Sequence, residues 1–175
     1  MHIIIDGYNL IRQSATLRRF ERFSLERGRQ ALISAMASYN KRCRHRITVV
    51  FDGWEGGGEA EERDRQDGIE IIYSRRGEKA DDVIKRLVQA KSAETLVVSS
   101  DRDIAVFAGR RGATAISSPD FDAAISKTAM QASHAGQAAD EKDEERGTTD
   151  GRKKKGPARR HSRKEKSLLA AIKKL

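Results

Sequence analysis

Five short apolar runs recur along the chain, and longer segments with a different spacing of apolar residues separate most of them. The runs are HIIID (2–6), ITVVFD (47–52), IEIIYS (69–74), TLVVSS (95–100) and ATAIS (113–117). β-Branched runs without alternating polar residues are typical of strands that are covered on both faces, as in a parallel sheet. Residues 24–42, 80–91, 102–110 and 121–130 instead have a helical pattern, illustrated by Val83, Ile84, Leu87 and Val88. This alternation predicts an α/β fold, a three-layer domain with a mainly parallel sheet of about five strands flanked by helices.

Two segments lie outside this pattern. Residues 54–66 (WEGGGEAEERDRQ) contain glycine and charge, and we expect them to form a flexible acidic loop between two strands. From about Ala132 the apolar periodicity ends, and an acidic stretch is followed by a basic one. We therefore expect a domain over residues 1–131, an acidic linker over 132–150 and a basic tail over 151–175. The final SLLAAIKKL is expected to become a short amphipathic helix on contact with a partner.

The charge is unevenly distributed, and this changes the interpretation of the tail. The chain has 35 Lys and Arg against 26 Asp and Glu, a formal net charge of +9. Residues 151–175 hold eleven of the basic residues and one acid, so the first 150 residues, with 24 basic and 25 acidic residues, are nearly neutral. A separate basic tail usually binds a polyanion such as RNA, DNA or an acidic membrane surface.

Several classes of protein are disfavoured by what the sequence lacks. Cys43 is the only cysteine, which rules out an intramolecular disulfide and suits a reducing cytosol. No apolar run approaches the ~20 residues of a membrane-spanning helix, and no signal peptide precedes the first strand, so we expect a soluble cytoplasmic protein. The chain has neither a phosphate-binding G-x-x-x-x-G-K-[ST] motif nor a G-x-S-x-G nucleophile motif.

Acidic residues recur where the predicted strands end. Asp6 and Asp52 close the first two strands, Asp101 and Asp103 follow the fourth, and Asp81 and Asp82 begin the helix after the third. Each alone has an ordinary structural explanation, as a helix cap, a first-turn acid or a turn residue. In an open α/β sheet, however, ligands bind outside the carboxyl ends of the strands. We therefore expect these acids to converge on one edge of the sheet.

Clustered carboxylates repel one another unless a cation lies between them. Mg²⁺ or Mn²⁺ fits best, because both take oxygen ligands and leave coordination positions for water and phosphate. Zinc is less suited, because Cys43 has no partner cysteine and the four histidines lack ligand spacing. A phosphotransferase related to the haloacid dehalogenases would have a second acid two residues after Asp6, where this chain has Tyr8. The pattern thus favours metal-assisted phosphodiester hydrolysis.

The motifs resemble those of a known family. D-G-Y-N (6–9), V-V-F-D-G (49–53), S-R-R-G-E-K-A-D-D-V-I (74–84) and V-V-S-S-D-R-D-I (97–104) look like the NYN domain, in its YacP-like branch of the PIN-like nucleases. The resemblance covers about residues 1–125 and implies an RNA-cleaving domain with an acidic Mg²⁺ or Mn²⁺ site. Members of the branch include ribosome-associated enzymes that cleave mRNA, which makes the ribosome a possible partner.

The resemblance also implies roles for individual residues. Asp6, Asp81 and Asp101 match the catalytic metal ligands, and Asn9 matches an asparagine that hydrogen-bonds a ligand or bound water. Asp52 is expected to support the site, while Asp82 and Asp103 are candidates for a second metal or for outer positions. Basic residues near this edge are expected to bind the RNA backbone, together with residues of the tail; they are Arg75, Arg76, Lys79, Arg102, Lys153, Lys154, Lys155, Arg159 and Arg160.

Alternatives to this interpretation stay open. Trp54 and Tyr8 either stack on bases or pack within the domain. A non-catalytic RNA- or ribosome-binding NYN module would keep the same fold, although it would gain nothing from acids facing phosphates. A phosphatase acting on small substrates would not need a basic tail. A DNA-directed nuclease is also compatible, because nothing in the sequence distinguishes RNA from DNA.

Overall fold

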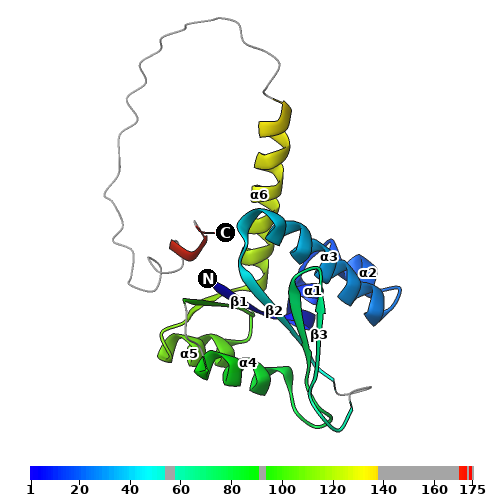
Figure 1. The fold of residues 1–175 in the computed structure, drawn as a ribbon, viewed down its shortest axis with the longest axis vertical. Helices are drawn as coiled ribbons and strands as arrows, with labels where there is room; N and C mark the ends of the chain where they lie inside the picture. The colour runs from blue at the N-terminus through cyan, green and yellow to red at the C-terminus, as the bar shows by residue number, and fades with distance from the viewer. Residues whose placement is uncertain (54–57, 91–93, 138–169, 173, 175) are drawn as a thin grey trace, which may run out of the picture.

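The computed structural model describes residues 1–53, 58–90, 94–137, 170–172 and 174. Six strands form one sheet in the order β3-β4-β2-β1-β5-β6, and every pairing is parallel except that of β3 with β4 (Figure 1). The strands are β1 (His2–Asp6), β2 (Arg46–Phe51), β3 (Glu62–Gln66), β4 (Ile69–Tyr73), β5 (Thr95–Val98) and β6 (Thr114–Ile116). The predicted α/β fold with a mainly parallel sheet is confirmed.

Six helices accompany the sheet over the described residues. They are α1 (Gly7–Gln13), α2 (Leu17–Glu21), α3 (Leu25–Cys43), α4 (Ala80–Gln89), α5 (Arg102–Arg110) and α6 (Ser118–Gln137). The three helices expected near residues 24–42, 80–91 and 102–110 are confirmed as α3, α4 and α5. The short helices α1 and α2 were not expected. Helix α6 continues to Gln137, so the linker expected from residue 132 begins within helical backbone.

Strand β3 corrects the prediction of a loop over residues 54–66. Its five residues pair antiparallel with β4 through a turn in which Asp67 and Gly68 both have positive φ, 50° and 82°. Two such residues in a tight turn match the right-handed twist of a hairpin. The strand is charged and exposed, as edge strands often are, and it therefore lacks the apolar pattern that predicts a strand.

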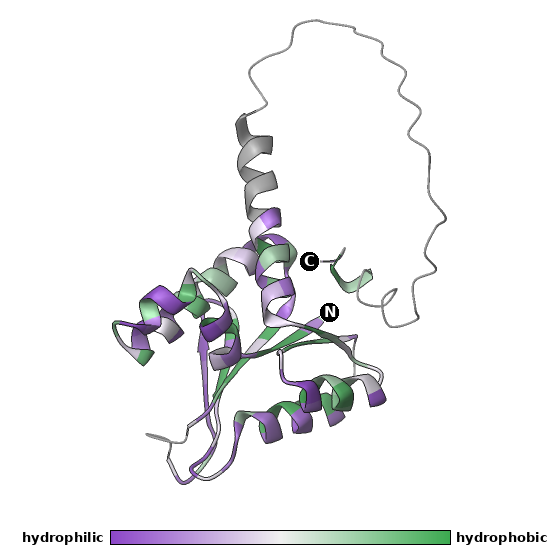
Figure 2. Cartoon of the chain, turned by 180° about the vertical axis from the view of Figure 1, so that it is seen from behind, coloured by the Kyte–Doolittle hydropathy of each residue, from purple (hydrophilic) through white to green (hydrophobic). Residues whose placement is uncertain are grey.

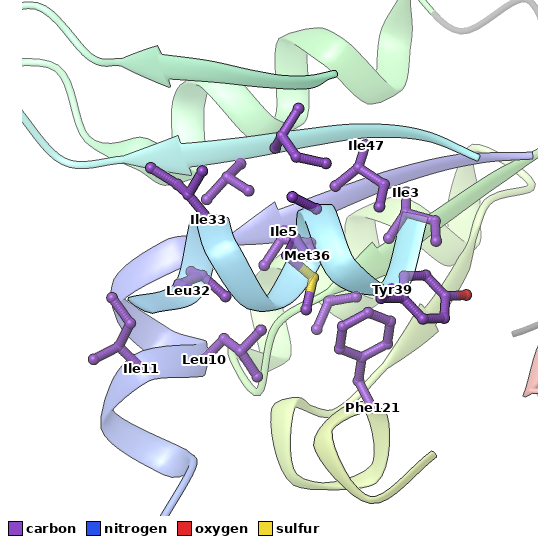
Figure 3. Close-up of a cluster of buried hydrophobic side chains, with 14 of the residues drawn as sticks. Ile3, Ile5, Leu10, Ile11, Leu32, Ile33, Met36, Tyr39, Ile47 and Phe121 are labelled. Atoms are coloured by element: carbon purple, nitrogen blue, oxygen red, sulfur yellow. The ribbon is translucent and has the colours of Figure 1, made fainter. Parts of the chain in front are cut away.

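Alternate residues of the sheet belong to two separate cores. Ile3 and Ile5 point to the side covered by α1, α3 and α6, where Met36 and Phe121 pack against them (Figure 3). Ile4 points to the other side, into the cluster formed with α4 and α5. The ribbon shows the same three layers, and the apolar sides of α4 and α5 face the sheet (Figure 2). The predicted layering is confirmed.

The order of the strands creates a crevice beside β1. The connection from β1 to β2 runs through α1, α2 and α3, whereas α4 connects β4 to β5 across the opposite face of the sheet. The connections leaving the carboxyl ends of β1 and β5 therefore diverge to opposite faces. Such a switch point is where open α/β sheets bind ligands.

The described C-terminal residues lie at the other edge of the sheet. Ala171 is 3% exposed and belongs to the core that contains Ile3. Lys174 forms an ion pair of 2.7 Å with Glu94, and its carbonyl oxygen is 3.0 Å from Nε2 of His45. Residues 170–172 have helical backbone, and Ala171 and Ile172 pack against the domain, while most of the segment expected to form a C-terminal helix lies outside the described residues. Within the described residues, no helix has the length and apolar character needed to cross a bilayer.

Candidate active site

A cavity of about 530 Å³ opens at the carboxyl ends of β1, β2 and β5, and the strand order reverses between β1 and β5. Its lining contains four of the predicted site acids, Asp6, Asp52, Asp81 and Asp101. The remaining lining residues are Tyr8, Asn9, Arg12, Gln13, Leu25 and Ala80. Segments that are far apart in the sequence thus place their acids around one space, as the strand ends predicted.

Asp6 is the most buried of these acids. It ends β1 and caps α1, because its Oδ1 accepts a hydrogen bond of 3.2 Å from the backbone N–H of Asn9. Its Oδ2 accepts a hydrogen bond of 3.0 Å from the hydroxyl of Ser99. Burial raises the pKa of Asp6 to about 6, with the charges of Asp81 and Asp101 adding to the rise and the two hydrogen bonds opposing it. The fold therefore holds this carboxylate at an energetic cost.

Asp81 faces the same cavity from the first turn of α4. Burial raises its pKa, and the charge of Asp101 adds to the effect, although Lys85 and Lys79 partly oppose it. Asp6 and Asp81 form no ion pair among the residues that the structure describes. Both acids are thus held near like charges without a basic partner in direct contact.

Asp101 is fixed by the helix that it begins. Its Oδ1 accepts hydrogen bonds from the backbone N–H groups of Asp103, at 2.7 Å, and Ile104, at 3.1 Å, which makes it the N-cap of α5. The hydroxyl oxygen of Ser99 accepts a hydrogen bond of 3.1 Å from the backbone N–H of Asp101 while donating to Asp6. One serine therefore positions two of the acids.

Asn9 has a structural role that the sequence did not predict. Its Oδ1 accepts hydrogen bonds from Ser118 Oγ at 2.7 Å, Gln13 Nε2 at 2.9 Å and the Ser100 N–H at 3.0 Å. These contacts join α1 to the start of α6 and to the loop after β5. The carbonyl oxygen is thus occupied within the protein, and Nδ2 is the group of Asn9 that remains for a ligand. Sequence reasoning did not find Ser118, because no local pattern marks a contact 109 residues away.

Of the other predicted acids, Asp52 lines the cavity, whereas Asp82 and Asp103 do not. Asp52 follows β2 and lines the cavity, with its Oδ1 3.4 Å from the hydroxyl oxygen of Ser74. Asp82 and Asp103 are exposed in the first turns of α4 and α5 and are not part of the cavity lining. Acids in these positions interact favourably with the helix dipole, which accounts for both without a ligand.

The donor set of the cavity suits a hard divalent cation, because its acidic ligands supply only carboxylate oxygens. Among the described residues, no three His, Cys, Asp or Glu side chains are close enough together to enclose one ion. Mg²⁺ typically uses one or two carboxylates and keeps several water molecules. Asp6, Asp81 and Asp101 fit that form of binding, since all three line one cavity and the charge of Asp101 adds to the raised pKa of both Asp6 and Asp81.

None of the four predicted RNA-binding residues in the described part of the chain lines the cavity. Arg75, Arg76, Lys79 and Arg102 lie in the segments that precede or begin α4 and α5. Arg75 lies 3.5 Å from Glu78. Lys153, Lys154, Lys155, Arg159 and Arg160 lie outside the described residues, as does Trp54.

The cation in the cavity wall is Arg12, which sequence reasoning missed. Its guanidinium lies 5.5 Å from the centre of the Tyr8 ring and 3.4 Å from Glu21. The Tyr8 hydroxyl accepts a hydrogen bond of 3.1 Å from Arg29, and its ring meets Phe51 edge to face. Tyr8 therefore packs within the domain while one part of it lines the cavity.

Comparison with known proteins matches this chain to one family and to a relative with the same family name. Residues 3–170 match the family described as the YacP-like NYN domain. The "Uncharacterized protein YacP" of Bacillus subtilis (strain 168) is 34% identical over 88 residues, which are 50% of this chain and 51% of that relative. The chain thus matches about half the length of this curated relative.

Solved structures share the fold. The crystal structure of Rae1 (YacP) from Bacillus subtilis has a TM-score of 0.63 and 27% identity, covering 78% of this chain and 80% of that one. The structure of a tryptophan-to-leucine mutant of the same Bacillus protein has a TM-score of 0.65 and 24% identity, covering 82% of this chain and 86% of that one. The motifs, the fold and the match over residues 3–170 lead to one conclusion: the chain belongs to the YacP-like NYN domain family.

Proposed function

We propose that this protein is a metal-dependent endoribonuclease, which hydrolyses RNA phosphodiester bonds in the cavity lined by Asp6, Asp81 and Asp101. The observation that carries the proposal is the burial of Asp6 beside two other acids, with its pKa raised to about 6. A carboxylate in such a place is costly unless a cation or a proton neutralises it. The family membership and the position at the strand switch support the same conclusion.

Asp6, Asp81 and Asp101 would hold Mg²⁺ or Mn²⁺, directly or through bound water, with Asp52 supporting them from the end of β2. When bound, such an ion lowers the pKa of a water molecule and stabilises negative charge on the phosphate and on the leaving oxygen. No side-chain nucleophile is required for this reaction. The donor set agrees with the ion, since the acids in the cavity offer oxygen ligands alone.

The protein's own residues would fix the geometry of the site. The hydroxyl of Ser99 orients the Asp6 carboxylate and, through the backbone of Asp101, the start of α5. Asn9 holds α1 against the loop after β5, which leaves its Nδ2 to donate to a phosphate oxygen. Arg12, in the cavity wall, supplies the positive charge that attracts the RNA backbone.

The test is cleavage of end-labelled single-stranded RNA with Mn²⁺, with Mg²⁺ and with a chelator, with DNA of the same sequence alongside. We expect cleavage of RNA only when metal is present, and loss of cleavage in Asp6→Asn and Asp101→Asn. Asp103→Asn is the matched control, because Asp103 is an exposed acid of the same helix outside the cavity. Equal rates for wild type and Asp6→Asn, with both proteins folded, would refute the assignment.

The same experiment separates the alternatives. RNA binding without cleavage under every metal condition would support a non-catalytic RNA-binding module instead. Cleavage of DNA as fast as RNA would make the protein a general nuclease. Cosedimentation with ribosomes tests the narrower proposal that it acts on mRNA during translation in the cytoplasm.

A further inference from the structure

The corner between α2 and α3, residues 17–27, exposes aromatic side chains to solvent. Phe23 is 73% exposed and Phe20 is 45% exposed, and Leu25, two residues later, is 42% exposed. Across the described residues, Val106 is the only other large hydrophobic side chain exposed to this degree. Single exposed apolar residues are common, but three within six positions form a patch that favours a partner. We refer to residues 17–27 as the α2–α3 corner.

The α2–α3 corner is also basic. It contains Arg18, Arg19, Arg22 and Arg27, and within the described part of the chain none of these side chains forms an ion pair. Its two acids are already engaged, Glu21 by Arg12 and Glu26 by Arg29. The guanidinium of Arg27 lies 5.6 Å from the centre of the Phe23 ring. The patch therefore combines aromatic faces with positive charge that no acid of the described chain neutralises.

The α2–α3 corner adjoins the mouth of the active-site cavity. Leu25 is one of the lining residues, and so is Arg12, which the 3.4 Å contact with Glu21 connects to α2. Figure 1 shows α2 and the start of α3 beside α1, the helix that carries Tyr8 and Asn9. Phe23 is two residues from Leu25 in the chain, so the exposed patch continues from the cavity wall into the corner.

We propose that the α2–α3 corner binds single-stranded RNA outside the cavity, with a base stacked on Phe23 and phosphates contacting the surrounding arginines. The inference rests on the proposed function, because it specifies the form in which RNA reaches that site. Stacking requires an unpaired base, since the bases of a duplex are already stacked on one another. Arg27 over the Phe23 ring holds one face of the ring and leaves the other for a base.

Binding is measured with a fluorescently labelled oligouridylate of about ten nucleotides, on the full chain with a chelator present so that no cleavage occurs. We expect Phe23→Ala to weaken binding by about 5- to 150-fold, the range of one lost base stack. Phe23→Tyr should bind as wild type, whereas Phe23→Leu, which keeps an apolar side chain without an aromatic face, should bind like Phe23→Ala. Val106→Ala, an exposed apolar change on α5, serves as the matched control and should bind within about 2-fold of wild type.

Salt dependence distinguishes stacking from phosphate binding. Phe23→Ala removes no charge, so its plot of affinity against salt should shift without changing slope. Arg19→Gln with Arg22→Gln should reduce the slope, by about 0.7 for each phosphate of a single strand that these arginines neutralise. Unchanged binding of Phe23→Ala, or full rescue by Phe23→Leu, would overturn the stacking proposal.

Two further outcomes are decisive. If Phe23→Ala converts a wild-type dimer into a monomer in sedimentation, the patch is an interface between copies of the chain and the proposal is wrong. If wild type lacks metal-dependent cleavage but Phe23→Ala still weakens RNA binding, the α2–α3 corner is supported while the proposed hydrolysis fails. In an active enzyme, Phe23→Ala should raise KM for long RNA and leave kcat unchanged.

Discussion

The pKa of acidic residues shifts in opposite directions at the two ends of the strands, which we call the amino edge and the carboxyl edge of the sheet. At the edge formed by the amino ends of the strands, Glu70 accepts hydrogen bonds from Thr48 at 2.9 Å and Arg46 at 3.1 Å. Burial works against ionisation of Glu70, yet these hydrogen bonds and the charge of Arg46 lower its pKa overall. At the same edge, the hydrogen bond from Lys174 lowers the pKa of Glu94.

At the carboxyl edge, the pKa of both Asp6 and Asp81 is raised, mainly by burial. The chain has 35 basic residues and pairs several of them with acids elsewhere, so a shortage of basic residues does not explain the difference. The carboxyl edge keeps Asp6 and Asp81 near like charges at the expense of stability, which is common where a site must receive a ligand. Acids at the amino edge thus stabilise the fold, whereas those at the carboxyl edge suit the proposed cation.

The strongest test of this contrast is Asp6→Asn. Cleavage should fall by about 10²–10³-fold, because a charge that organises the site is lost. Stability should change in the other direction and rise by about 1–3 kcal/mol at pH 7, because the buried charge is removed. Urea unfolding at several pH values checks the second effect.

The sign of this pH dependence follows from the raised pKa of Asp6, about 6 against 3.8 in the unfolded chain. The folded wild type takes up a proton more readily than the unfolded chain, so it loses stability as pH rises from about 4 to about 6. Asp6→Asn does not have this titration, and its advantage should disappear near pH 4. An Asp6→Asn protein that is less stable than wild type at pH 7 would contradict the contrast.

A divalent cation should stabilise the protein through the acids of the carboxyl edge, and a change at the amino edge should not alter this effect. Mn²⁺ at about 100 times its dissociation constant would raise the free energy of unfolding of wild type by about 2.7 kcal/mol. Asp6→Asn should lose most of this gain, whereas Glu70→Gln should keep it. Thermal midpoints with and without Mn²⁺ give the comparison, and an equal shift in all three proteins would place the ion elsewhere.

Gly7→Ala tests how tightly the carboxyl edge is packed. A Cβ at this position would lie 2.4 Å from Cε1 of Phe51, a ring that is fully buried in the core. We expect destabilisation by about 1–3 kcal/mol, together with reduced cleavage because α1 and Asp6 must shift. Gly109→Ala is a suitable control, since nothing lies within 4 Å of its added Cβ.

The smallest expected effect is that of Glu70→Gln at the amino edge. Because Glu70 has a lowered pKa, its stabilisation is present above the unfolded pKa of 4.5 and is lost as pH falls below it. We expect a loss of about 0.5–1 kcal/mol at pH 7 in low salt, discounted for partial exposure. Cleavage should be unchanged, and a stability gain like that of Asp6→Asn would remove the distinction between the edges.

The apolar runs predicted the parallel strands because burial on both faces requires them to be apolar throughout. Strand β3 was not predicted, because an exposed edge strand such as ERDRQ needs no apolar face. The helical pattern alone does not tell Asp81 from Asp82, and only the resemblance to the NYN family favoured Asp81. Adjacent helical residues point about 100° apart, and only the three-dimensional position of α4 decides which of them faces the cavity.

The same limit applies to the residues that support the site. The bond from Ser118 to Asn9 joins positions 109 residues apart, and Ser99 acts across 93 residues to reach Asp6. Neither contact has a local pattern, because the fold alone brings the segments together. The motif around Asp101 could be identified in the sequence. The role of Ser99 could not, because it depends on the pairing of β1 with β5, which brings Asp6 close to it.

The C-terminal contacts have a practical consequence for work on the basic tail. Ala171 is packed in the core and Lys174 pairs with Glu94, so these C-terminal residues are part of the domain. Deleting residues 151–175 would also remove a piece of the core, so a loss of RNA binding after truncation would mix charge with stability. Replacing Lys153, Lys154 and Lys155 by glutamine removes the charge and keeps the anchor.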